Sequence, residues 1–231
     1  MAEAASVQTP RRHLLATLRA RFDGAALRVA LPGQDGQAVR IPTAAQAARW
    51  APLQAWCFEG VGDGRSPLLQ PTRLALMDQR FSVALWPTAA GRTEHDLIDA
   101  FCRHLDGSHQ LLAAGGALGG LLLRLRVKAR DVAWWRGRRP TDPWDCGYAL
   151  NEPAARAALA RFEPRRATLV VAMDWTGQAL VDAINAMARS STRFAHPVRW
   201  LVVHHAPGDI TEQLRSAGLP VRLLQPEDAD R

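Results

Sequence analysis

Hydrophobic and polar residues alternate in two different ways along the 231-residue chain, and the change falls near residue 150. Before it, 26–42 and 72–87 alternate residue by residue on both sides of a polar turn, which predicts two antiparallel hairpins. The helical spacing of apolar residues predicts helices at 12–22, 43–57 and 93–105. Thr43 and Thr93 are the expected N-caps of the second and third of these helices. The first part of the chain is therefore predicted to be a mixed α+β lobe.

After residue 153, apolar runs alternate regularly with amphipathic stretches. The pattern predicts strand 167–175, helix 177–191, strand 198–205, helix 209–218 and strand 220–224. Asp209 and Glu212 have the spacing of a capping box, and Gly218 is a typical C-terminal stop. Uniformly apolar strands joined by helices are typical of a parallel sheet, so we expect a Rossmann-like βαβαβ unit.

The intervening segment 138–153 is rich in Pro, Asp and Gly and is predicted to be a linker or long loop. The fold class is thus α/β, with an α+β lobe over 1–137 and the parallel unit over 154–231. The alternative is that the two parts form one continuous domain.

The stretch 124–139, "RLRVKARDVAWWRGRR", carries seven positive side chains and one acid. Its net charge of +6 leaves about +1 for the rest of the chain, whose total is +7. A strand beginning near Leu121 would place alternate side chains on one face, about 7 Å apart, with Leu125 among those facing the core. The positive residues are Arg124, Arg126, Lys128, Arg130, Arg136, Arg138 and Arg139.

This pattern favours non-catalytic binding of nucleic acid or another polyanion, in which arginines contact phosphates and Trp134 or Trp135 stacks on a base. Adjacent tryptophans on a strand point to opposite faces, so at most one of them can stack. A second interpretation is a solvated strand whose cations discourage edge pairing. A third is a scaffold subunit of a multiprotein complex, where the same residues meet an acidic protein surface.

Composition changes this picture only slightly. The basic residues are 28 arginines and one lysine, a bias typical of GC-rich bacterial genes, so the pI of 10.7 is weaker evidence than the local charge. Three separated cysteines predict neither disulfides nor a zinc site. The sequence shows no apolar run long enough for a secretory signal or a membrane span, which predicts a cytoplasmic protein. We expect no cofactor.

Asp174 ends one predicted strand, and His204 and His205 end the next. Parallel strands would bring all three to the carboxyl edge, where ligands of open α/β sheets bind. Alternation requires only one of the two histidines to turn inward. These residues indicate a further alternative, which is catalytic: a hydrolase or nuclease-like enzyme that uses Asp174 with His204 or His205.

The segment "VVAMDWTGQ" (170–178) resembles the first metal-binding loop of von Willebrand factor A domains. Asp174 and Thr176 match the first two ligands, whereas Gln178 stands where that family has a serine. The region is also similar to the core of PD-(D/E)xK nucleases. That resemblance implies Asp145 and Asp174 as the acids, and Lys128 would have to supply the lysine that Thr176 replaces.

Other candidate motifs favour ordinary structure. The chain has no GxxxxGK[ST], GxSxG or HExxH, and the glycines of 115–120 are more typical of a turn. Tryptophans 50, 56, 86 and 200 are predicted to be core residues. One group of possible metal ligands is interpreted as a solvated helix face: Glu94, His95, Asp99, Cys102, His104 and His109.

Overall fold

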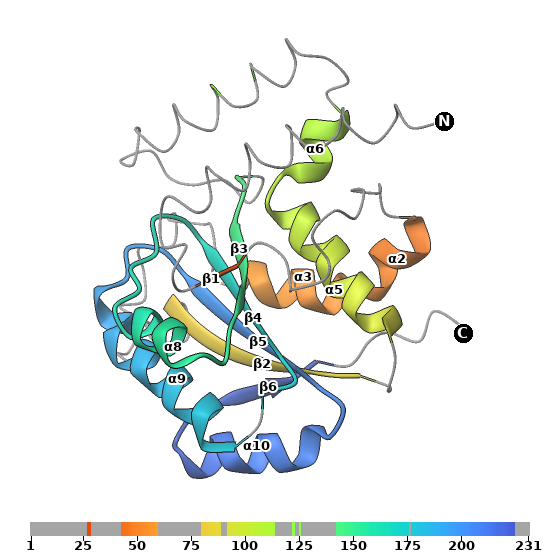
Figure 1. Ribbon diagram of the computed structural model, residues 1–231. Helices are drawn as coiled ribbons and strands as arrows, with labels where there is room; N and C mark the ends of the chain where they lie inside the picture. Colours follow the sequence, from red (N-terminus) through yellow and green to blue (C-terminus); the bar gives the residue numbers. More distant parts are fainter. Residues whose placement is uncertain are drawn as a thin grey trace, which may run out of the picture.

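The structure is a computed structural model that describes residues 27–28, 43–59, 80–88, 92–113, 122, 125, 142–175 and 177–224. Its centre is a six-stranded sheet that lies between two layers of helices (Figure 1). The described part of the chain is thus an α/β structure, as the sequence predicts. None of its helices is long and apolar enough to cross a bilayer.

The sheet has the strand order β1-β3-β4-β5-β2-β6. Five neighbouring strands are parallel, and the two-residue β1 pairs antiparallel with β3 at one edge. The strands are β1 (Leu27–Arg28), β2 (Phe81–Pro87), β3 (Asp145–Ala149), β4 (Thr168–Met173), β5 (Val198–His204) and β6 (Val221–Leu223).

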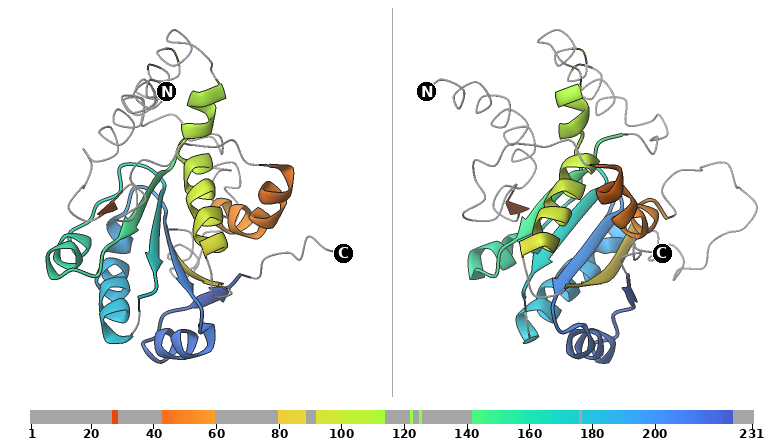
Figure 2. Two further views of the ribbon diagram at one scale, coloured as in Figure 1. Left: turned by 45° about the vertical axis from the view of Figure 1, so that its right-hand side comes forward. Right: turned by 90° about the vertical axis from the view of Figure 1, so that its right-hand side faces the viewer.

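Each face of the sheet is covered by its own helices, as the two views of Figure 2 show. One face, called the α5 face below, carries α2 (Ala44–Arg49), α3 (Ala51–Phe58) and α5 (Arg92–Leu105), with α6 (Ser108–Ala113) following α5. The other, called the α9 face, carries α8 (Pro153–Leu159), α9 (Gly177–Ser190), the 3-10 turn η1 (Ser191–Arg193) and α10 (Pro207–Ser216). Strand side chains alternate between the two faces: Val170 and Ala172 pack on the α9 face, Leu169 and Val171 on the α5 face.

The predicted hairpin at 72–87 is wrong for its second arm. β2 hydrogen-bonds in parallel to β5 on one side and to β6 on the other, so neither side is left for an antiparallel partner. It also has buried residues on both faces, which is typical of a central parallel strand. Consequently the βαβαβ unit is interrupted, because α10 carries the chain from β5 across β2 to β6.

The predicted loop 138–153 contains a strand. β3 is buried along its whole length and pairs in parallel with β4 through Asp145 to Tyr148. Cys146 and Tyr148 lie in the core of the α5 face, whereas Ala149 lies in that of the α9 face. The Pro- and Asp-rich flanks therefore begin and end a short strand, and the burial of β3 outweighs its low intrinsic β-propensity.

The helices predicted at 43–57, 93–105, 177–191 and 209–218 are confirmed with different boundaries. Thr43 caps α2 in a capping box with Gln46, but the helix breaks at Trp50 because Pro52 occupies the first turn of α3. α10 begins at Pro207 with Ala206 as an N-cap without a side-chain bond, so the predicted capping box at Asp209 is wrong. Gly218, with φ of +77°, ends this helix as expected.

Several predicted elements lie outside the described residues: helix 12–22, the glycines of 115–120 and hairpin 26–42 apart from Leu27 and Arg28. Leu27 and Arg28 pair with Ala149 and Tyr148 of β3. Among the described residues, antiparallel pairing occurs between these two strands. Leu122 and Leu125 have helical backbone and are 67% and 54% exposed. At these two positions the predicted strand, with Leu125 facing the core, is wrong.

Candidate functional site

The carboxyl edge of the sheet has a change of connection direction between two neighbouring strands. From β2 the chain enters α5 on one face, whereas from β5 it enters α10 on the other. β2 and β5 pair directly along their length. Such a switch point is where open α/β sheets generally bind ligands. The residues that follow β2, β4 and β5 are therefore the first place to look for a site.

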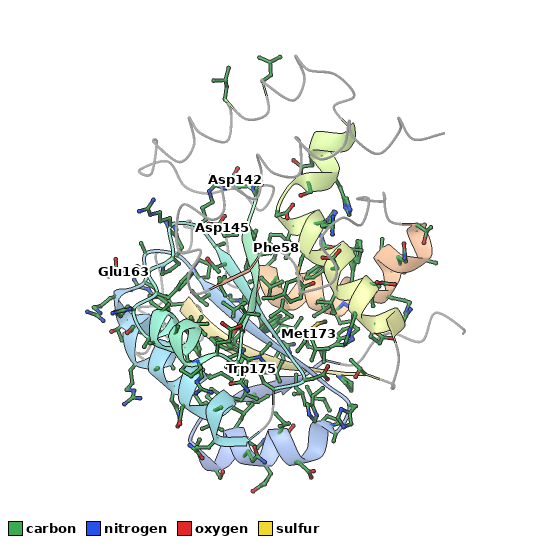
Figure 3. All side chains as sticks on the ribbon, viewed as in Figure 1. Phe58, Asp142, Asp145, Glu163, Met173 and Trp175 are labelled. Atoms are coloured by element: carbon green, nitrogen blue, oxygen red, sulfur yellow. The ribbon has the colours of Figure 1, made fainter. Side chains whose placement is uncertain are left out.

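The turn from β4 into α9 holds Asp174 in an unusual conformation. Asp174 has φ of +54°, and among the described residues it is the one non-glycine residue with positive φ. Its neighbours fix it on both sides: Met173 packs toward the α5 face, whereas Trp175 is buried in the core of the α9 face (Figure 3). The Asp174 N–H also donates to the carbonyl of Val203, 3.1 Å away. This turn is thus held by the packing of Met173 and Trp175 and by the last hydrogen bond between β4 and β5.

The left-handed conformation of Asp174 redirects its carboxylate. Strand alternation would place this side chain on the α9 face, beside His204, because Met173 and Val203 are paired in register. Instead, Oδ2 lies 3.8 Å from Nε2 of His95, in the first helical turns of α5. Both side chains are accessible, with 56% of Asp174 and 31% of His95 exposed. The structure therefore joins Asp174 to a histidine that the sequence interpretation placed on a solvated helix face.

His204 and His205 differ in burial, which fits the prediction that only one of them turns inward. His204 is 4% exposed and His205 is exposed, and their rings stack with centroids 4.4 Å apart. Nδ1 of His204 lies 2.9 Å from the Ala206 N–H and 3.3 Å from the Ala206 carbonyl oxygen, which leaves Nε2 as the second ring nitrogen. That buried Nε2 has no hydrogen-bond partner among the described residues. The Asp174 carboxylate pairs with neither histidine in the described contacts.

The start of α5 is anchored by a second carboxylate. Glu94 accepts from Nη2 of Arg49 at 2.6 Å and from Nε1 of the buried Trp86 at 3.2 Å. These contacts tie α2, α5 and β2 together one residue before His95. His95 is consequently presented by a helix whose first turns are fixed to the sheet, which limits how far its ring can move from Asp174.

Further along α5 and into α6, the predicted solvated face is wrong for three residues. Asp99, Cys102 and His109 are buried. Asp99 accepts from Arg103 at 2.6 Å and from the buried Tyr148 hydroxyl at 3.4 Å. Burial raises the pKa of Tyr148 well above its ordinary value, and the neighbouring Cys102 and Asp99 raise it further. Helical periodicity assigned Asp99 to a solvated face because the sequence does not show that its carboxylate is paired with Arg103 and Tyr148 inside the fold.

The predicted nucleic-acid-binding residues lie outside the described part of the chain: Arg124, Arg126, Lys128, Arg130, Trp134, Trp135, Arg136, Arg138 and Arg139. Thr176 does so as well, and Gln178 donates to Asp182 within α9. Asp145 begins β3, whereas Asp174 follows the end of β4. Since Asp145 pairs with Thr168, six residues before Asp174, the two acids lie about 20 Å apart and do not converge.

Within the described ranges, no group of three or more His, Cys, Asp or Glu side chains is placed to hold a metal ion. The predicted core tryptophans 50, 56, 86 and 200 are all buried, which confirms that prediction. Comparisons of the chain with protein-family models, with curated proteins and with solved structures found no match. Functional inference therefore depends on the charge of the chain and on the geometry of this edge.

Proposed function

We propose that the protein binds nucleic acid or another polyanion through residues 124–139, without catalysis. The observation that carries the proposal is the concentration of charge: a net +6 in this stretch against about +1 elsewhere. Arg124, Arg126, Lys128 and Arg130 would contact phosphates, with Arg136, Arg138 and Arg139 extending the contact, and Trp134 or Trp135 would stack on a base.

The ion pairs of the described residues support this assignment. Several arginines that contact the sheet or the helices of the α5 face are neutralised by carboxylates: Arg49 by Glu94, Arg103 by Asp99, Arg166 by Asp145 and Arg222 by Glu59. Charges balanced in this way contribute little attraction to a distant polyanion. The excess charge of 124–139 is then the best source of long-range attraction.

Titration of fluorescein-labelled single- and double-stranded oligonucleotides, read by anisotropy at several salt concentrations, tests the proposal. Phosphate contacts release counterions, so the logarithm of the binding constant should fall linearly with the logarithm of salt, by roughly 0.7 to 0.9 per contact. Affinity that does not change with salt contradicts the proposal.

Charge reversal separates the segment from the rest of the molecule. Arg124→Glu with Arg126→Glu should weaken binding and reduce the salt slope. The control with the same charge change is Arg189→Glu with Arg215→Glu, on exposed positions of α9 and α10, and it should reduce binding much less. Equal losses in both variants mean that the net charge alone matters. An acidic protein that copurifies after nuclease treatment, with no oligonucleotide binding, identifies the scaffold role instead.

A further inference from the structure

We propose that residues 118–132 bind the surface of an anionic lipid bilayer, with leucines among the acyl chains and basic side chains at the phosphate layer. This inference rests on the proposed polyanion binding and names the polyanion as a membrane surface rather than a nucleic acid. The observation that carries it is the exposure of Leu122 and Leu125, which have helical backbone and border the basic stretch 124–139.

The two leucines form an exposed apolar pair. Leu122 and Leu125 are the most exposed large apolar side chains among the described residues, at 67% and 54%. Neither belongs to the core of the α5 face or to that of the α9 face. Helical spacing places residues three apart on the same side. Single exposed apolar residues are ordinary, whereas exposed apolar residues that gather on one side are typical of a surface that binds a partner.

Helical spacing also changes which charges accompany the leucines. On a strand the cations of 124–130 would share one face, whereas the spacing of Leu122 and Leu125, continued along the sequence, predicts an apolar stripe between two basic borders. Arg126 and Arg130 fall at one border, and Arg124 and Lys128 fall at the other. This is the pattern of helices that lie in the interface of a bilayer. The stripe consists of Leu118, Leu121, Leu122, Leu125, Ala129 and Val132.

The leucines favour a bilayer over the other partners of a basic surface. A nucleic-acid backbone offers phosphates but no apolar layer, so both leucines would stay in water beside it. A second copy of the chain would bring another net +6 against the first, which opposes association. An anionic bilayer attracts the cations with its headgroups and takes the leucines into its acyl layer. Trp134 and Trp135 follow in the sequence, and tryptophan is enriched at this interface.

Cosedimentation of the full-length protein with large unilamellar vesicles tests the inference. One set of vesicles contains phosphatidylcholine alone, and the other contains about 30% phosphatidylserine in addition. We expect binding to the anionic vesicles to be at least about tenfold tighter than to the neutral vesicles, and to weaken as the salt concentration rises.

Three variants separate the apolar contact from the charged one. Leu122→Ser with Leu125→Ser should weaken binding to the anionic vesicles about tenfold or more, because two apolar side chains no longer enter the acyl layer, and should leave any oligonucleotide binding unchanged. The control is Leu223→Ser, at the third exposed leucine, which lies on β6, and it should leave vesicle binding unchanged. Arg124→Glu with Arg126→Glu should weaken binding to vesicles and to oligonucleotides alike.

The outcomes distinguish this inference from the proposed function. Anionic vesicles that bind the double serine variant as tightly as the unchanged protein overturn the inference, because charge alone then accounts for the binding. Oligonucleotide binding without vesicle binding also overturns it, but supports the proposed function with a nucleic acid as the polyanion. Binding to neither vesicles nor oligonucleotides overturns both proposals.

Discussion

The two faces of the sheet are held to their helices in different ways. The core of the α9 face consists of aliphatic and aromatic side chains from β2, β4, β5 and the helices α8, α9 and α10. The α5 face has a similar apolar core, but polar tethers cross it as well. Glu94, Asp99 and Arg199 each connect a helix to the sheet or to another helix.

Two consecutive residues of the central strand show this contrast. Trp200 is fully buried on the α9 face and acts through packing alone, since its Nε1 has no partner among the described residues. Arg199, on the opposite face, is 1% exposed and donates to the carbonyls of Cys57 and Glu59 at 3.3 and 2.7 Å. These carbonyls lie at the C-terminal end of α3, where a cation also suits the helix dipole. Packing thus dominates the α9 face, whereas the α5 face combines an apolar core with specific donors and acceptors.

The largest effect is expected from a cavity on the α9 face. Ile184→Ala on α9 removes a fully buried side chain and should lower the free energy of unfolding by about 4 kcal/mol, read from urea denaturation. Arg189→Ala, an exposed position of the same helix, is the control and should change little. A loss below about 1 kcal/mol for Ile184→Ala would mean that this face is not a tightly packed core.

Removing the Arg199 tether should have the next largest effect. Arg199→Met keeps most of the volume but leaves the carbonyls of Cys57 and Glu59 without their charged donor, which should cost about 3 kcal/mol. Arg222→Met is the matched control, because exposed Arg222 also contacts Glu59, through its side chain. Surface ion pairs contribute about 0 to 1 kcal/mol. If the two variants have equal effects, burial of the tether has no special role.

The α9 face was the easier of the two to predict from the sequence. The apolar runs of β4 and β5 and the periodicity of α9 are local signals, and alternation along β5 correctly required one inward histidine. β2 was misjudged because its own pattern shows that it is a strand but does not reveal its partners. β3 was missed because a strand of only five residues that contains Asp and Gly has little local signal.

The error in β2 also hid part of the candidate site. Had β2 been placed parallel to β5, the helix that follows it would have had to begin at the carboxyl edge, next to Asp174. His95, in the first turns of that helix, would then have been an evident neighbour. In an antiparallel hairpin the same helix begins elsewhere. The parallel pairing of β2 with β5, which the sequence does not reveal, therefore determines that Asp174 lies next to the accessible His95 and not next to the buried His204.

A smaller effect is expected for the tether at the start of α5. Glu94→Gln keeps the shape but weakens the contacts with Arg49 and Trp86, and should cost about 1 to 2 kcal/mol because the carboxylate is largely buried. Glu163→Gln, at an exposed position of the α9 side, should leave the urea midpoint unchanged. A double-mutant cycle with Arg49→Met measures the pair itself, and a coupling energy near zero would remove it from the set of tethers.

The smallest effect at neutral pH is expected for Tyr148→Phe, about 1 kcal/mol or less, because the bond of its hydroxyl to Asp99 is long at 3.4 Å.

The loss of stability at alkaline pH distinguishes the α5 face further. Burial raises the pKa of Tyr148 above its ordinary 10.0, and burial also raises that of Cys57 above 9.0, although Arg199 opposes the latter. The folded state keeps these protons where the unfolded state loses them, so stability is complete below about pH 9 and falls as the pH rises beyond it. Tyr148→Phe should flatten the part of this loss that begins near pH 10, and Cys57→Ala the part that begins near pH 9. Urea midpoints from pH 7 to 11 measure both slopes, and identical slopes in all three proteins would show that neither group is buried as described.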